Sequence, residues 1–166
     1  MSMDRYHRAF GVYGILYRKN KLLVIKKTSG PYINRFDLPG GSQEFGERLE
    51  DTLVREIKEE TNLTVKAFQQ LGVVNFLYPW RYENTNMNNH IATFYEIDSF
   101  IGENFEKVDQ FLGQDSVGSI WLPLEELTED NSSLLVLKAK EYIQKGTFID
   151  KGWILDKWNI LDSPVY

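Results

Sequence analysis

Three glutamates stand close together in the chain, at a spacing that would gather their carboxylates. Glu56, Glu59 and Glu60 occupy positions i, i+3 and i+4, and residues at these intervals lie on one face of an α-helix. Such carboxylates repel one another, and near the C-terminal end of a helix the dipole disfavours them further. An ordinary solvent-exposed acidic face is one explanation. A cluster that breaks several rules without local compensation indicates a functional site instead, and a hard divalent cation is its natural counter-charge.

The stretch from Glu47 to Thr61 is predicted to be the helix that carries these acids. It contains neither Gly nor Pro and is made mostly of good helix formers. Its apolar residues recur on one side, as Leu49, Leu53 and Ile57. Successive residues turn about 100° around a helix, so Glu60 falls at the edge of this apolar side rather than out in water. Asn62 is predicted to end the helix in a left-handed conformation.

The segment from Gly41 to Leu63 resembles the Nudix box, a family pattern written G-x5-E-x7-R-E-U-x-E-E-x-G-U, in which U is aliphatic. The matching positions are Gly41, Glu47, Arg55, Glu56, Ile57, Glu59, Glu60 and Leu63. Asn62 stands where the pattern has glycine, and asparagine can adopt the same backbone conformation. Outside the box the resemblance is looser and rests on the stretches Leu38 to Gly41 and Trp121 to Leu127.

The resemblance implies a metal site for Mg²⁺ or Mn²⁺. Glu59 and Glu60 would be the main ligands. Glu56 would be a ligand or the general base, and the carbonyl of Gly40 a further ligand. These are the hard oxygen donors that Mg²⁺ prefers.

Two more residues of the box have supporting roles by the same resemblance. Arg55 would orient the carboxylates through charge-assisted hydrogen bonds, so that Glu56, Arg55 and Glu59 are the predicted catalytic residues. The alternative for Arg55 is a helix-surface ion pair of little consequence. Glu47 is expected to close the junction between loop and helix, or else to be an ordinary acid favoured by the dipole in the first helical turn.

Residues outside the box are further candidates. Asp115 and Glu96 are candidate general bases, because the base varies in position within the family; the alternative is an ordinary surface acid. Trp80 and Arg81 are candidate substrate-binding residues that could stack on a nucleobase, although aromatic side chains also belong to cores. His90 is expected at a loop or strand edge rather than in a metal site, since a single histidine without partners is weak support for a ligand.

The composition bounds the class of protein. At 166 residues the chain is long enough for one domain with its own core. A net charge of −5 argues against a DNA- or RNA-binding protein, but not against a small nucleotide whose charge a metal neutralises. The chain has no cysteine and therefore no disulfides or thiol chemistry. It shows no signal region and no membrane-length apolar segment, so we expect a cytoplasmic monomer or homodimer that does not associate with membranes.

Sequence patterns elsewhere predict a strand-rich domain with a second helix. The predicted strands are 9–17, 22–25, 63–76, 91–97 and 120–124, and the second helix is 132–145. Residues 80–90 are interpreted as a polar connection and 98–118 as a surface loop or short helix. The tail, residues 146–166, holds Trp153 and Trp158 and is expected to pack on the domain or on a partner subunit. With the family resemblance, this predicts an α/β/α sandwich with a mixed β-sheet.

The resemblance implies that residues 1–166 form a single hydrolase domain that acts on phosphoric anhydride bonds. It would cleave the pyrophosphate linkage of a nucleoside diphosphate joined to another group. Candidate substrates are nucleoside triphosphates, oxidised nucleotides, ADP-ribose, nucleotide sugars and dinucleoside polyphosphates. An isoprenyl diphosphate isomerase of related fold is disfavoured because such enzymes carry a catalytic cysteine. The remaining alternative is a non-catalytic, nucleotide-sensing module.

Overall fold

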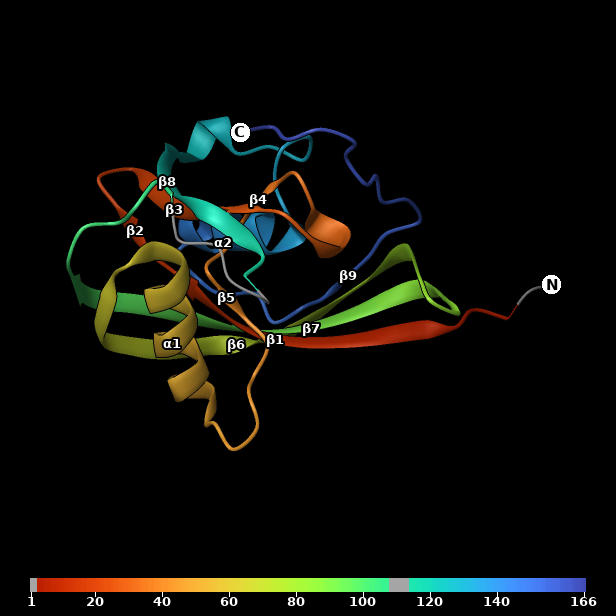
Figure 1. Ribbon diagram of the computed structural model, residues 1–166, viewed down its shortest axis with the longest axis horizontal. Helices are drawn as coiled ribbons and strands as arrows, with labels where there is room; N and C mark the ends of the chain where they lie inside the picture. The colour runs from red at the N-terminus through yellow and green to blue at the C-terminus, as the bar shows by residue number, and fades with distance from the viewer. Residues whose placement is uncertain (1–2, 108–113) are drawn as a thin grey trace.

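Two β-sheets and two α-helices make up the part of the chain that this computed structural model describes, residues 3–107 and 114–166 (Figure 1). The first sheet contains β1 (Tyr6–Ile15), β5 (Gly40–Gly41), β6 (Thr64–Tyr82), β7 (Thr85–Ile101) and β9 (Trp153–Ile154). The second contains β2 (Tyr17–Arg18), β3 (Lys21–Lys27), β4 (Phe36–Asp37) and β8 (Ser116–Pro123). The helices are α1 (Leu49–Thr61) and α2 (Leu134–Lys145), with single 3₁₀ turns at Gly30–Tyr32 and Leu124–Glu126.

The first sheet is mixed. In the strand order β5-β1-β7-β6-β9, the pairs β1–β7 and β6–β9 are parallel, and the other neighbours are antiparallel. The second sheet, β2-β3-β4 with β8 beside β3, is antiparallel throughout. The predicted mixed sheet is therefore confirmed.

Neighbouring residues of β1 enter two different hydrophobic clusters. Val12 packs in one cluster with Leu53 and Ile57 of α1, whereas Tyr13 belongs to the cluster that contains Leu135 of α2. Successive side chains of a strand point to opposite faces of the sheet. The first sheet therefore lies between the two helices, which confirms the predicted α/β/α sandwich.

The long hairpin β6–β7 corrects one sequence expectation. Residues 80–90 are not a polar connection, because β6 continues through Tyr82 and β7 begins at Thr85. Two of the asparagines that suggested a loop, Asn88 and Asn89, bond across the two strands. Asn88 Nδ2, for example, donates a hydrogen bond of 2.7 Å to the hydroxyl of Tyr78. Cross-strand polar pairs support a sheet as apolar pairs do, and the partners of these asparagines lie too far along the chain for a local pattern to show them.

The segment 98–118 is also partly strand rather than a loop or short helix. Strand β7 extends through Ile101, and β8 begins at Ser116. The middle of this segment, residues 108–113, lies outside the described residues.

The C-terminal tail packs back on the domain. Trp153 of β9 pairs with Phe76 of β6 in parallel register. The indole of Trp158 donates a hydrogen bond of 2.8 Å to the carbonyl of Pro31, and the hydroxyl of Tyr166 donates one of 2.7 Å to the carbonyl of Lys27. The tail thus covers the loop that leads to β4 and β5. Across residues 3–107 and 114–166, neither helix combines the length and the apolar character needed to cross a bilayer.

Candidate active site

Helix α1 positions the three glutamates. Leu53 and Ile57 are fully buried and fix the rotation of the helix against the first sheet. The helix ends at Asn62, whose φ of 67° is left-handed and whose amide donates to the carbonyl of Lys58 at 2.9 Å. The predicted C-terminal cap is therefore confirmed, and asparagine does here what glycine does in the family pattern.

Glu60 is the innermost acid of the cluster, with only 1% of its surface exposed. Its Oε2 accepts a hydrogen bond of 2.8 Å from the amide of Gly40. Its Oε1 is buried and, within the described residues, has no hydrogen-bond partner. Burial raises the pKa of Glu60 well above its usual value; the charge of Lys27 opposes this rise, and the charge of Glu56 adds to it. A buried carboxylate oxygen without a partner is costly, so a cation or a proton at this atom would be favourable.

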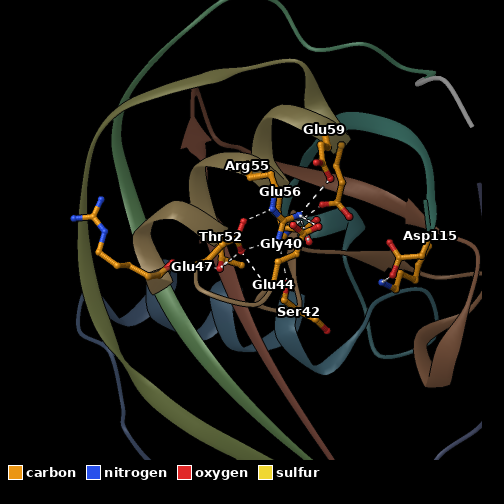
Figure 2. A network of polar contacts seen from close by, with 12 residues as sticks. Gly40, Ser42, Glu44, Glu47, Thr52, Arg55, Glu56, Glu59 and Asp115 are labelled. Carbon is orange, nitrogen blue, oxygen red and sulfur yellow. Dashed lines mark hydrogen bonds and ion pairs between the residues drawn. The ribbon is translucent and has the colours of Figure 1, made fainter. Parts of the chain in front are cut away.

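Arg55 lies among the carboxylates, as Figure 2 shows. Its Nη1 donates to Glu56 Oε1 at 3.0 Å and to Glu59 Oε2 at 3.4 Å. The side chain of Glu56 is 16% exposed and that of Glu59 is 37% exposed. Burial raises the pKa of Glu56, and the guanidinium of Arg55 limits that rise. Arg55 is thus placed to orient two of the three acids.

Glu47 holds Arg55 from the other side. Arg55 Nε donates to Glu47 Oε1 at 2.6 Å, and Nη2 donates to Glu47 Oε2 at 3.0 Å. Glu47 Oε2 also accepts from the hydroxyl of Thr52 at 2.7 Å and from the amide of Glu44 at 3.0 Å. Hydrogen bonds from Arg55 lower the pKa of Glu47 to about 2. Glu47 therefore joins the loop to the helix and sets the direction of the arginine.

The glycines of β5 make room for this cluster. A Cβ atom at Gly41 would lie 2.7 Å from Glu56 Oε1. Gly40 has a φ of 145°, and a Cβ there would lie 2.1 Å from the carbonyl oxygen of Val12. Gly40 therefore needs a residue without a side chain, and a side chain at Gly41 would displace the carboxylate of Glu56.

The donor set suits a hard divalent cation. The glutamates supply carboxylate oxygens, and Oε1 of Glu60 is the buried atom without a partner. Among the described residues, however, no three acidic or histidine side chains already surround one point as ligands would. The contacts of Arg55 explain this arrangement, since its guanidinium draws Glu56 and Glu59 toward itself. Glu56, Glu59 and Glu60 are the residues of the cluster that could hold such a cation.

The structure brings Asp115 toward the cluster, together with a lysine that the sequence pattern did not single out. Asp115 forms an ion pair with Lys27, and its charge contributes to raising the pKa values of Glu56 and Glu60. Figure 2 shows Asp115 on the side of the acids away from Glu47. The one sequence signal for Lys27 was its place as the second of two lysines that follow the apolar run of β3.

The structure does not bring Glu96 to the cluster. Glu96 Oε2 accepts hydrogen bonds from the hydroxyl of Tyr142 on α2 at 3.0 Å and from Nε2 of the Gln69 side chain at 2.9 Å. Its neighbour Tyr95 packs against the α1 side of the sheet, so strand alternation places Glu96 on the opposite face. Glu96 is therefore not a base for this site.

The predicted substrate-binding residues Trp80 and Arg81 also lie away from the acids. Trp80 stacks on Tyr82 with ring centroids 5.0 Å apart and meets the edge of His7 at 5.5 Å. His7 lies on β1 six residues before Tyr13, the residue that pairs with Gly40. At about 3.3 Å per strand residue, this separates Trp80 from β5 by roughly 20 Å.

His90 is neither in a loop nor at a strand edge. It lies in the middle of β7, buried, with Nε2 and Nδ1 each 3.0 Å from the hydroxyls of Tyr13 and Tyr32. Burial lowers the pKa of His90 to about 3. A neutral imidazole with both nitrogens satisfied is a structural residue of the core, which agrees with the expectation that it is not a ligand.

Comparison with known proteins supports the interpretation of the box. The family model of the NUDIX domain matches residues 5–145. The chain is 49% identical over 67 residues to the ADP-ribose pyrophosphatase of Methanocaldococcus jannaschii, covering 40% of each protein. It is 27% identical over 81 residues to the 8-oxo-dGTP diphosphatase of Escherichia coli K12, covering 48% of the chain and 61% of that relative. The chain thus spans less than two thirds of the length of these relatives.

Solved structures show the same fold. The MutT NUDIX hydrolase of Burkholderia pseudomallei superposes with a TM-score of 0.65 and 24% identity, over 81% of this chain and 97% of that one. The NUDIX domain of Shewanella oneidensis NrtR, solved in complex with ADP ribose, gives a TM-score of 0.58 and 17% identity, over 88% and 90% of the two chains. With its box, its sandwich and a domain match over residues 5–145, the chain belongs to the Nudix family.

Proposed function

We propose that the protein is a divalent-metal-dependent hydrolase that cleaves the pyrophosphate linkage of a nucleoside diphosphate joined to another group. One observation carries the proposal: Glu56, Glu59 and Glu60 share one helix face beside Gly40, and the buried Oε1 of Glu60 has no partner in the described part of the chain. A solvated acidic face would not bury its central carboxylate. The substrate partner is a small nucleotide.

Each box residue has a distinct task in this proposal. Bound Mg²⁺ or Mn²⁺ would neutralise phosphate charge and lower the pKa of a water molecule. Glu59 and Glu60 would hold it, with the carbonyl of Gly40 as a further oxygen donor. Arg55 orients the side chains of Glu56 and Glu59 through its hydrogen bonds to them. Glu47 holds the guanidinium of Arg55 from the other side.

Glu56 is the group best placed to accept the proton of the attacking water. Burial raises its pKa, and a carboxylate of raised pKa is a stronger general base. The rival base, Asp115, is engaged by Lys27. Glu56 would therefore combine the roles of ligand and base.

A substrate panel tests this function. ADP-ribose comes first, because the Methanocaldococcus relative is an ADP-ribose pyrophosphatase, and 8-oxo-dGTP second, because two relatives are 8-oxo-dGTP diphosphatases. A nucleotide sugar and a dinucleoside polyphosphate complete the panel. With Mg²⁺ we expect a mononucleotide product from at least one compound, and no product with a chelator. Tight binding without turnover across the panel would show a nucleotide-sensing module instead.

A further inference from the structure

Two cationic side chains, Arg55 and Lys27, lie beside the carboxylate cluster in the described part of the chain. They differ in how many of their hydrogen-bond donors are already used. The guanidinium of Arg55 donates hydrogen bonds to Glu47, Glu56, Glu59 and the carbonyl of Ser42. Lys27 has three donors on its ammonium group. Within the described residues that group hydrogen bonds to Asp115, which leaves donors for another acceptor.

Strand geometry aims Lys27 at the cluster. Residues two apart on a strand share a face, so Lys27 lies on the same side of β3 as Leu23, which packs in the cluster of α1. The register between β3 and β8 shifts between Ile25 and Lys27, which pair with Ser119 and Ser116. The extra residue therefore lies in β8, and the alternation of β3 continues as far as Lys27. The carbonyl of Lys27 is held by the hydroxyl of Tyr166 at 2.7 Å.

The surroundings of Lys27 are strongly acidic. Burial alone would lower its pKa, but the charges of Asp115, Asp37 and Glu60 outweigh burial and raise it. The side chain of Lys27 is 13% exposed, and that of Asp115 is 37% exposed. The ion pair is therefore open on the Asp115 side, where an anion can exchange with the carboxylate. A purely structural buried ion pair needs no such opening.

We infer that Lys27 is a substrate-binding residue that contacts a phosphate group held beside the metal, with Asp115 keeping its ammonium in place until the substrate arrives. This inference rests on the proposed function and deepens it. The same lysine supplies positive charge next to Glu60, so it competes with a metal ion for that carboxylate. Lys27 should therefore weaken metal binding and strengthen phosphate binding, and the two effects have opposite signs.

Two titrations separate these effects without any turnover. Purified full-length protein is titrated calorimetrically with Mn²⁺ alone, and then with inorganic phosphate in saturating Mg²⁺. Lys27→Met should tighten Mn²⁺ binding and weaken phosphate binding, each by about fivefold or more, the lower end of typical coupling between sites. Lys26→Met is the matched control, since the ammonium of Lys26 reaches only the carbonyl of Glu106, at 3.4 Å, among the described residues. It should change neither affinity.

Two results of the titrations would contradict a phosphate-binding role for Lys27. Unchanged phosphate affinity in Lys27→Met, or weaker binding of both Mn²⁺ and phosphate, would overturn the inference in favour of a structural ion pair. If Lys27→Met fails to fold, the charge-balanced double variant Lys27→Met with Asp115→Asn replaces it. The double variant should bind Mn²⁺ about as wild type does but still bind phosphate weakly, and wild-type phosphate affinity would overturn the inference.

The test also keeps this inference apart from the proposed function. A wild-type protein that binds Mn²⁺ and phosphate but hydrolyses nothing on the panel would overturn the function and leave the assignment of Lys27. A wild-type protein that hydrolyses its substrate, with a Lys27→Met variant of unchanged phosphate affinity, would overturn the assignment alone.

Discussion

Glu60 Oε2 accepts a hydrogen bond of 2.8 Å from the amide of Gly40, which ties the last turn of α1 to β5. The two residues are 20 positions apart in the chain, and both are proposed to face the metal. One oxygen of the carboxylate therefore holds the loop, while the other, Oε1, stays without a partner in the described residues. The bond fixes the side chain that a metal ion would need.

Replacing Glu60 with glutamine should leave the metal-free protein as stable as wild type, or more stable by about 0.5–2 kcal/mol. The amide oxygen of glutamine can still accept from Gly40, and the variant no longer buries a charge next to Glu56. Thermal melting in chelator measures this difference. In excess Mg²⁺ the melting temperature of wild type should rise, since a ligand that binds only the folded state stabilises it, and that of the variant should rise much less.

The control for Glu60→Gln is Glu50→Gln, which removes a charge from the exposed first turn of the same helix. Its response to Mg²⁺ should match that of wild type. A Glu60→Gln protein that is clearly destabilised in chelator, yet gains as much from Mg²⁺ as wild type, would show that Glu60 is a structural acid.

Substitution of Glu59 by glutamine should remove most of the hydrolysis, by about a thousandfold in rate, because a lost metal ligand costs several kcal/mol of transition-state stabilisation. Asp51→Asn is the matched control on the same helix. Asp51 is bound by Arg48, with Nη2 and Oδ1 2.8 Å apart, on the outer side of the helix. Steady-state rates on the active compound of the panel measure both variants. Equal, mild losses would favour the solvated acidic face.

The local parts of this site could be predicted from the sequence. The helix and the position of Glu60 against the apolar side follow from a 3.6-residue period, which a short segment displays completely. The left-handed end follows from the residue type of Asn62. The contact of Arg55 with Glu59 follows from the same spacing. These features depend on neighbours within one or two helical turns.

The parts that failed depend on partners far along the chain. Asn88 belongs to a strand in which Tyr78 lies opposite it. The residues next to Asn88 in the sequence do not reveal this pairing. Trp80 was placed near the nucleotide because of its neighbours in sequence, whereas the length of the hairpin carries it away from β5. Lys27 was overlooked because its acidic surroundings come from three separate segments, those of Asp37, Glu60 and Asp115.

Glu47→Gln should destabilise the protein at neutral pH, and the loss should shrink in acid. Hydrogen bonds from Arg55 hold the pKa of Glu47 at about 2, against an ordinary 4.5. A carboxylate with a depressed folded-state pKa contributes stability above its unfolded pKa, and that contribution is lost as pH falls through the folded value. Urea midpoints of wild type and variant at about pH 7 and pH 3 measure the difference. A constant difference at both values would mean that the charge of Glu47 is not what matters.

Asp37 should make the opposite contribution to stability. Burial raises its pKa from 3.8 to about 6, although Lys27 opposes the rise and the hydroxyl of Ser133 donates to its Oδ1 at 2.5 Å. The folded state then holds the proton more tightly than the unfolded state, so stability falls as pH rises from about 3.8 to about 6. At 1.36 kcal/mol per pKa unit, the loss is about 2–3 kcal/mol.

The free energy of unfolding of Asp37→Asn, relative to that of wild type, should therefore rise by about 2–3 kcal/mol between pH 3.5 and pH 7. The reason is that asparagine cannot ionise and keeps an acceptor for Ser133. His90 has the opposite effect on stability in the same pH range. Its pKa is lowered from 6.5 to about 3, so its contribution to the stability of the folded state is lost as pH falls below about 6.5. In wild type the two partly cancel, whereas the variant should become steadily more stable from pH 4 to pH 6.5. Denaturant unfolding across this range, with the exposed Asp156→Asn as a control for the lost charge, measures it. Parallel curves for wild type and Asp37→Asn would show that Asp37 is not titrating in the core.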